Sequence, residues 1–239
     1  MKASLLKSLR GAISTKTPAC VVTHLETGEQ NLLTHQGQIE GDLVLTEGLQ
    51  QEAQQALARG RSGLLSDENY FAECLLPPAR LMVVGAVHIA QKLCPMADLM
   101  GYEVTLIDPR RAWSTSARFP GLTILQSWPD EALEQLAPDS RSAIVTLTHD
   151  PKLDDPALEV ALKSPAFYIG ALGSTRTHDK RLQRLRELGL DEETLKRIHG
   201  PVGLSIGARA PSEISVSILA ELTAALHGAE IQRKVPKDA

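Results

Sequence analysis

A glycine-containing turn near residue 85 is the first segment whose residue types suggest ligand chemistry. The dinucleotide-binding fingerprint is Gly-x-Gly-x-x-Gly/Ala, in which the second glycine lets a pyrophosphate approach the backbone. Gly85 and Ala90 satisfy the first and third positions, but Val87 stands in the second, where its branched side chain would crowd a pyrophosphate. The turn, with Ala86, therefore predicts a phosphate contact at a helix N-terminus and disfavours NAD in its standard pose. His88 is either a ligand contact or a partly exposed residue at the start of the helix.

An acidic residue follows the next apolar run, twenty-three residues after Gly85. This spacing predicts that Asp108 bonds a ribose hydroxyl of a nucleotide. Arg110 lies two residues further on, and a guanidinium can hold a phosphate through two hydrogen bonds. The alternative is that Asp108 and Arg110 form only an ion pair at the end of a strand.

The segment Thr148-His149-Asp150 follows another apolar run. In a parallel sheet these residues fall at the carboxyl edge, where ligands bind, so they predict a ligand contact or a proton relay. The alternative is turn chemistry, since Asp150-Pro151 is a common turn start.

A second anion cradle is predicted after the run 166–169. Gly170 and Gly173 permit close approach of the backbone, and Ser174 offers a donor at a helix start. The basic residues further along this helix are predicted to form a solvated face: Lys180, Arg181, Arg184 and Arg186.

The most distinctive segment is the stretch 200–213, which carries Gly207 and Arg209 before a helix. Pro211 suits the first turn of that helix, and Glu213 suits its positive end. Three glycines and an arginine before the helix exceed what a plain connection needs, so this stretch is also a candidate binding segment.

Strands and helices alternate from residue 80 onward, which indicates an α/β fold. Parallel strands need right-handed crossovers, so we expect a Rossmann-like doubly wound parallel sheet of six strands. The expected strands are 81–86, 102–107, 122–125, 143–147, 166–169 and 202–206, and the expected helices are 88–100, 130–136, 156–162, 178–188 and 211–226. Pro95 should kink or shorten the first helix.

The N-terminal part reads differently from the rest. Residues 1–67 predict a small α+β domain with two to four strands, and the pair Pro77-Pro78 indicates a stiff linker over residues 68–79. The Rossmann-like domain is then expected over residues 80–228. Residues 229–239 form a basic tail that carries Arg233, Lys234 and Lys237.

Composition narrows the possible functions. The formal net charge is −4, so no global basic field argues for nucleic acid. No run approaches the ~18 apolar residues of a membrane span, and charges interrupt the N-terminal apolar positions, so we expect no signal peptide and a cytoplasmic protein. The three cysteines lack Cys-x-x-Cys spacing, which predicts reduced, mostly buried thiols and no metal ligands.

Taken together, these motifs resemble the XdhC/CoxI family, accessory factors of xanthine dehydrogenase and related molybdenum hydroxylases. The resemblance covers roughly residues 75–228 in order. It is carried by the Gly85–His88 turn, Asp108-Pro109-Arg110, Thr148-His149-Asp150, Tyr168-Ile169-Gly170 with Gly173-Ser174, and above all Gly203–Glu213 running into Ile218-Leu219-Ala220-Glu221.

The resemblance implies a maturation factor without catalytic residues. Such a protein would bind molybdenum cofactor, protect it during sulfuration with a cysteine desulfurase, and insert it into an apo-hydroxylase; it would also be a homodimer. Two features depart from the family pattern: Val87 replaces a glycine, and the segment Gln36–Asp42 lacks the cysteine motif expected in the N-terminal domain. The alternatives from the residues are an NAD(P)-dependent oxidoreductase and a scaffold that binds a nucleotide without catalysis.

Overall fold

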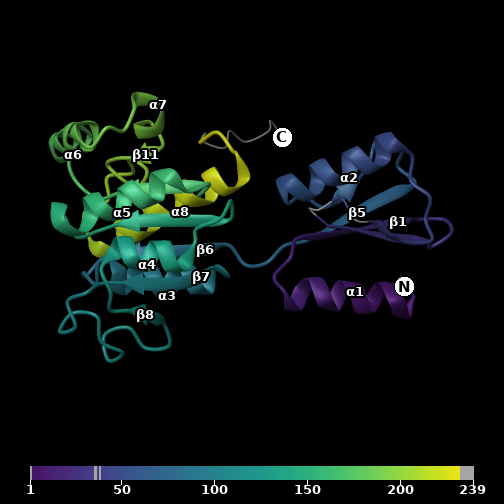
Figure 1. Ribbon diagram of the computed structural model, residues 1–239, viewed down its shortest axis with the longest axis horizontal. Helices are drawn as coiled ribbons and strands as arrows, with labels where there is room; N and C mark the ends of the chain where they lie inside the picture. Colours follow the sequence, from purple (N-terminus) through teal and green to yellow (C-terminus); the bar gives the residue numbers. More distant parts are fainter. Residues whose placement is uncertain (1, 35–36, 38, 232–239) are drawn as a thin grey trace, which may run out of the picture. The chain divides into compact units, whose positions relative to one another are not determined.

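The computed structural model describes residues 2–34, 37 and 39–231. The chain divides into two compact units, Met1–Pro77 and Pro78–Ala239, each with its own sheet (Figure 1). Gln36 and Gln38 of the segment 36–42, and residues 232–239 of the basic tail, lie outside the described residues.

The first unit contains an antiparallel sheet in the order β3-β2-β1-β5-β4. Helix α1 packs on one face and α2 on the other, because residues along a strand alternate between the two faces. Ala19 and Val21 of β1 pack with α1, whereas Cys20 and Val22 pack with α2. The elements are α1 (Ala3–Ser14), β1 (Ala19–His24), β2 (Gln30–Thr34), β3 (Ile39–Gly41), α2 (Glu47–Arg59), β4 (Gly63–Leu64) and β5 (Tyr70–Leu75).

This unit has more strand than the sequence predicts. The described part of residues 1–67 forms β1 to β4, within the two to four strands expected there, but a fifth strand, β5, lies within the segment 68–79 that the sequence predicts to be a linker. Strand β5 pairs along its whole length with β1, from Ala19↔Leu75 to His24↔Tyr70. The pairing explains the difference, since the partner strand is about fifty residues away and local sequence does not reveal it.

The second unit is a parallel sheet in the order β11-β10-β9-β6-β7-β8, which confirms the Rossmann-like fold class. The chain adds strands outward from β6 on one side and then returns to β9, so the topological switch point lies between β6 and β9. The strands are β6 (Arg80–Val84), β7 (Glu103–Ile107), β8 (Thr123–Leu125), β9 (Ser142–Thr146), β10 (Tyr168–Ala171) and β11 (Ile198–His199).

Helices cover both faces of this parallel sheet (Figure 1). Leu81 and Val83 of β6 pack in a core with α3 and α8, whereas Met82 and Val84 pack with α4, α5 and α6 on the opposite face. The helices are α3 (Ala90–Leu99), α4 (Pro129–Leu136), α5 (Pro151–Lys163), α6 (Thr175–Glu187), α7 (Glu192–Leu195) and α8 (Pro211–His227). Helix α3 passes through Pro95 and is shorter than the expected 88–100.

The final strand is not where the sequence predicts it. The expected strand 202–206 is a loop, and β11 is Ile198–His199. Gly203 has a φ of +94°, which breaks a strand, and its N–H donates to the Glu221 side chain instead of a neighbouring strand. A side-chain acceptor on α8 thus replaces the sheet partner that the apolar pattern suggested.

Two further observations concern membrane spans and the cysteines. The described part of the chain contains no helix long and apolar enough to cross a bilayer. All three cysteines are free thiols; Cys20 and Cys94 are buried, and Cys74 faces Cys20 across β1 and β5 with the sulfur atoms 4.0 Å apart.

Candidate functional site

The turns after β6 and β9 meet at the switch point. Gly85 has a φ of +112°, and a Cβ atom built on it would lie 2.6 Å from Cγ2 of Thr148. A side chain at this position would therefore collide with the β9 turn. The glycine that opens the incomplete fingerprint is needed for packing within the protein, whatever it contacts in a ligand.

Asp108 closes the first turn from the end of β7. Its carboxylate is fully buried and accepts hydrogen bonds from the N–H of Ala86 at 2.7 Å and from the N–H of Arg110 at 2.9 Å. Nε and Nη2 of Arg110 donate to its two oxygens at 2.9 and 2.7 Å. Burial raises the pKa of Asp108, but these hydrogen bonds outweigh burial and hold the pKa below its ordinary value. The structure thus has the ion pair that the sequence left as an alternative.

The loop that follows β7 packs over the same turn. Arg118 donates to the carbonyl of Ala86 at 3.0 Å, so protein groups engage both the N–H and the carbonyl of Ala86. The guanidinium groups of Arg110 and Arg118 lie 5.6 and 5.4 Å from the ring centroid of Trp113, within cation–π range. Val87 is half-buried against the α3 core, and His88 is exposed at the rim of the turn.

A buried carboxylate that the sequence analysis missed organises the turn after β9. Asp154, in the first turn of α5, accepts from the hydroxyl of Thr148 at 2.6 Å and from the N–H of His149 at 3.1 Å. These bonds hold His149 at a φ of +61°, a conformation uncommon for a residue with a side chain. Asp150 accepts from the N–H of Lys152 and caps α5, so the turn chemistry considered for this residue is present.

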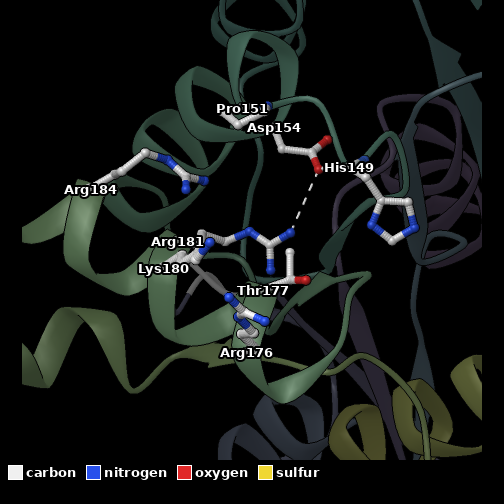
Figure 2. A pocket seen from close by; sticks show the side chains of 8 residues that line it. All are labelled: His149, Pro151, Asp154, Arg176, Thr177, Lys180, Arg181 and Arg184. Carbon is white, nitrogen blue, oxygen red and sulfur yellow. Dashed lines mark hydrogen bonds and ion pairs between the residues drawn. The ribbon is translucent and has the colours of Figure 1, made fainter.

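A cationic pocket lies beside His149, between the starts of α5 and α6 (Figure 2). Its volume is about 340 Å³. The lining residues are His149, Pro151, Asp154, Arg176, Thr177, Lys180, Arg181 and Arg184. Burial raises the pKa of the Asp154 carboxyl, while Arg181 lies 3.7 Å from it in an ion pair in which both side chains are 2% exposed.

The prediction that the basic residues of α6 form a solvated face is therefore wrong for Arg181 and Arg184. Arg181 is buried, and Arg184 pairs with Asp155 at 2.5 and 2.9 Å. Both side chains point toward α5, which the spacing of charges within one helix does not reveal. Lys180 and Arg186 are exposed as predicted, and Arg186 pairs with Glu192 on the surface.

The predicted second cradle, from Gly170 to Ser174, is built mainly for packing and capping. A Cβ atom on Gly170 would lie 2.5 Å from the Val202 side chain, so the glycine makes room for the loop after β11. Gly173 has a φ of +154° and sits against Thr177. The Ser174 hydroxyl accepts from the N–H of Thr177 at 3.2 Å and caps α6.

A second network missed by the sequence analysis centres on Glu221 of α8. Its carboxylate accepts from the Tyr168 hydroxyl at 2.6 Å and from the Gly203 N–H at 2.8 Å, and it lies 3.2 Å from Nδ1 of His199. The rings of Tyr168 and His199 stack with centroids 4.5 Å apart. The network fixes the loop after β11 to α8 and to Tyr168 of the sheet.

The predicted binding residues of the last segment are at the surface. Gly207 is exposed and Arg209 is exposed next to it in the loop, and the backbone N–H of Arg209 donates to Glu213 at 2.8 Å. Glu213 also accepts from the N–H of Ala210, so the positive end of α8 is occupied by the protein's own carboxylate. Among the described residues, no group of three or more His, Cys, Asp or Glu side chains could hold a metal ion.

Comparisons with known proteins agree with this architecture. The XdhC Rossmann domain matches residues 81–222. The chain is 34% identical over 154 residues to "Molybdenum cofactor insertion chaperone PaoD" of Escherichia coli, a match that covers 64% of this chain and 42% of PaoD. It is 30% identical over 155 residues to a Bacillus subtilis protein named as a probable xanthine dehydrogenase subunit, covering 64% of this chain and 45% of that protein.

A third relative, "Uncharacterized protein YqeB" of Escherichia coli, is 34% identical over 60% of this chain and 26% of its own length. The matches thus span less than half the length of these curated relatives. A solved structure from Bacillus halodurans, described as a xanthine dehydrogenase, shares the fold with a TM-score of 0.74 at 23% identity, over 94% of this chain and 67% of that one. The family match covers more than half of the chain, and the protein therefore belongs to the XdhC Rossmann domain family.

Proposed function

We propose that this protein is a maturation factor that binds molybdenum cofactor and passes it to an apo molybdenum hydroxylase of the xanthine dehydrogenase type. The names of two relatives support the proposal, since one is a molybdenum cofactor insertion chaperone and the other belongs by name to a probable xanthine dehydrogenase. The structural observation that carries it is the cationic pocket at the carboxyl edge of the sheet, next to the switch point.

The residues of this edge suit the chemistry of the proposed cargo. Molybdenum cofactor is a pterin that carries its metal on a dithiolene and ends in a phosphate, so it presents a strongly anionic end. Arg176, Lys180 and Arg181 supply positive charge beside the start of α6, where a helix dipole also favours anions. The turns at Gly85 and Thr148 would bound the remainder of the ligand and exclude water from it.

We also propose that sulfuration of the bound cofactor uses sulfur from a separate cysteine desulfurase, and that the protein works as a homodimer. The thiols of this chain are poor sulfur carriers because the thiolate is the reactive form. Burial raises the pKa of Cys94 to about 12 and also raises the pKa values of Cys20 and Cys74. A partner enzyme with an accessible thiol is therefore a better donor.

An NAD(P)-dependent reaction receives less support from the geometry. A ribose hydroxyl bound in the usual way would have to replace Arg110 on the Asp108 carboxylate. Val87 additionally narrows the approach to the first turn.

The test is to purify the protein from a host that makes molybdenum cofactor, oxidise it, and measure fluorescent pterin. We expect pterin well above that of protein purified from a host lacking the cofactor pathway, and we expect the loaded protein to activate an apo-hydroxylase. Calorimetry with NADH and NADPH provides the comparison. Absence of pterin together with NAD(P)H binding tighter than about 1 mM, roughly −4 kcal/mol, would refute the proposal.

A further inference from the structure

The pocket between α5 and α6 contains a buried guanidinium with open donors. Arg181 is 2% exposed, and its Nη2 donates to the carbonyl of Leu172 at 2.8 Å. Within the described part of the chain, Nε and Nη1 have no hydrogen-bond partner. Buried charged donors are normally paired, so two open donors on one buried arginine indicate a position for an anionic acceptor.

Asp154 does not fill this position. Its Oδ2 atom lies 3.7 Å from Nη2 of Arg181, beyond hydrogen-bond distance. Both carboxylate oxygens are already used, since Oδ1 accepts from the Thr148 hydroxyl and Oδ2 from the His149 N–H. Asp154 therefore serves mainly to hold the β9 turn. Figure 2 shows the Arg181 guanidinium between Asp154 and Thr177, where it lines the pocket.

The surrounding charges favour an anion. Four basic side chains line the pocket; Arg184 is paired with Asp155 and Arg181 with Asp154, so Arg176 and Lys180 supply the positive charge in excess of these ion pairs. Arg176 and Lys180 are exposed at the mouth, one helical turn apart on α6. His149 borders the pocket on the side of the switch point, so the pocket adjoins the crevice expected to hold a ligand.

We propose that this pocket binds a phosphate group, with Arg181 as the buried donor and Arg176 and Lys180 as the outer charges. Its volume of about 340 Å³ is near the lower limit for ligand sites, which fits one end of a ligand and not the whole of it. The inference deepens the proposed function and rests on it for the identity of the ligand: the group would be the terminal phosphate of the cofactor. A nucleotide presents the same chemistry, and the experiment separates the two sources.

The first measurement is calorimetric titration of the full chain with inorganic phosphate and pyrophosphate. The test variant is Arg176→Gln/Lys180→Gln, which changes two exposed side chains and should fold normally. The matched control is Arg186→Gln, on the same helix but outside the pocket and paired with Glu192. We expect binding to weaken at least about tenfold in the double variant and less than about twofold in the control.

Arg181→Met tests the buried donor directly. It should abolish phosphate binding, and circular dichroism would establish that it folds; if it does not fold, the double variant carries the test. Equal weakening per charge removed in the double variant and in Arg186→Gln would overturn the inference, because binding would then follow bulk charge. Failure of the wild-type chain to bind either anion up to about 10 mM would overturn it as well.

The second measurement assigns the source of the phosphate. Pterin content is compared among the wild-type chain, the double variant and the control, and the same three proteins are titrated with AMP. A loss of pterin confined to the double variant supports the inference in full. Unchanged pterin in that variant would show that the cofactor binds elsewhere, which refutes the inference and leaves the proposed function intact. Specific phosphate and AMP binding without any pterin would refute the proposed function and retain a nucleotide phosphate site.

Discussion

Replacement of Asp108 by alanine should destabilise the second unit by about 1.5–4 kcal/mol. The buried N–H of Ala86 would lose its acceptor, which costs about 1–3 kcal/mol. The bonds from Arg110 contribute less, about 0.5–1 kcal/mol, because that side chain is 37% exposed and water can replace the carboxylate. The Arg110 guanidinium that loses its partner is partly exposed and can be hydrated, so the loss should stay below that of breaking a fully buried ion pair.

The assay is urea unfolding followed by tryptophan fluorescence. Trp113 and Trp128 are the two tryptophans of the chain and both lie in the second unit, so the signal reports that unit. A loss smaller than about 0.5 kcal/mol would refute the reasoning, since it would mean that Asp108 does not hold the first turn closed.

The companion variant Arg110→Gln tests whether the ion pair with Asp108 stabilises the folded protein. The quantity measured is the unfolding free energy as a function of pH. The wild-type carboxyl has a lowered pKa, so its stabilisation is present above the unfolded value of about 3.9 and is lost as pH falls through the folded pKa. Without Arg110, burial dominates and the pKa should rise. The difference in unfolding free energy between wild type and variant should thus be largest near pH 7 and shrink toward about pH 4. Arg111→Gln, an exposed neighbour, is the control and should show no such trend.

Three other outcomes are expected. Gly203→Ala should cost about 1–3 kcal/mol of stability, because its Cβ would lie 2.4 Å from the Ser217 hydroxyl. The control is Gly189→Ala, since Gly189 has a similar φ but a Cβ there would have no neighbour within 4 Å, and this variant should cost less. Equal losses of unfolding free energy in the two variants would contradict the clash. Glu221→Gln should make stability less sensitive to acid below about pH 4. Burial raises the pKa of the native carboxyl, but its hydrogen bonds outweigh burial and lower that pKa, so wild type loses stability as the carboxyl is protonated. An unchanged pH profile of the unfolding free energy, measured with urea, would oppose this. Val87→Gly should not create NADH binding, because the first turn remains closed by its carboxylate and arginine; fluorescence titration that detects tight binding would show that the valine alone blocks the site.

The positions of the site turns could be predicted from the sequence because they follow strands. Apolar runs bounded by Gly85, Asp108 and Thr148 are local signals, and a parallel sheet places the ends of its strands at one edge. The ion pair of Asp108 with Arg110 was also foreseeable as an alternative, since the two residues are only two positions apart.

The partners across the fold were not predictable in this way. Asp154 and Arg181 lie on different helices, and the orientation that buries them depends on how α5 and α6 pack on the sheet. Glu221 likewise reads as an ordinary helical charge until α8 carries it against Tyr168 and Gly203. A long-range contact with a buried polar group leaves no periodic signal in the sequence.

By itself, the sequence determined the alternation of strands and helices, the Rossmann-like class and the family, because short-range periodicity and ordered motifs specify them. The tertiary structure alone decided what each motif does. Gly85 makes room for the β9 turn, the Asp108 carboxylate is paired with Arg110, and Arg181 is buried with two N–H groups that have no hydrogen-bond partner among the described residues. The physical reason is that burial and hydrogen-bond partners depend on which elements pack together, and that packing joins residues far apart in the chain.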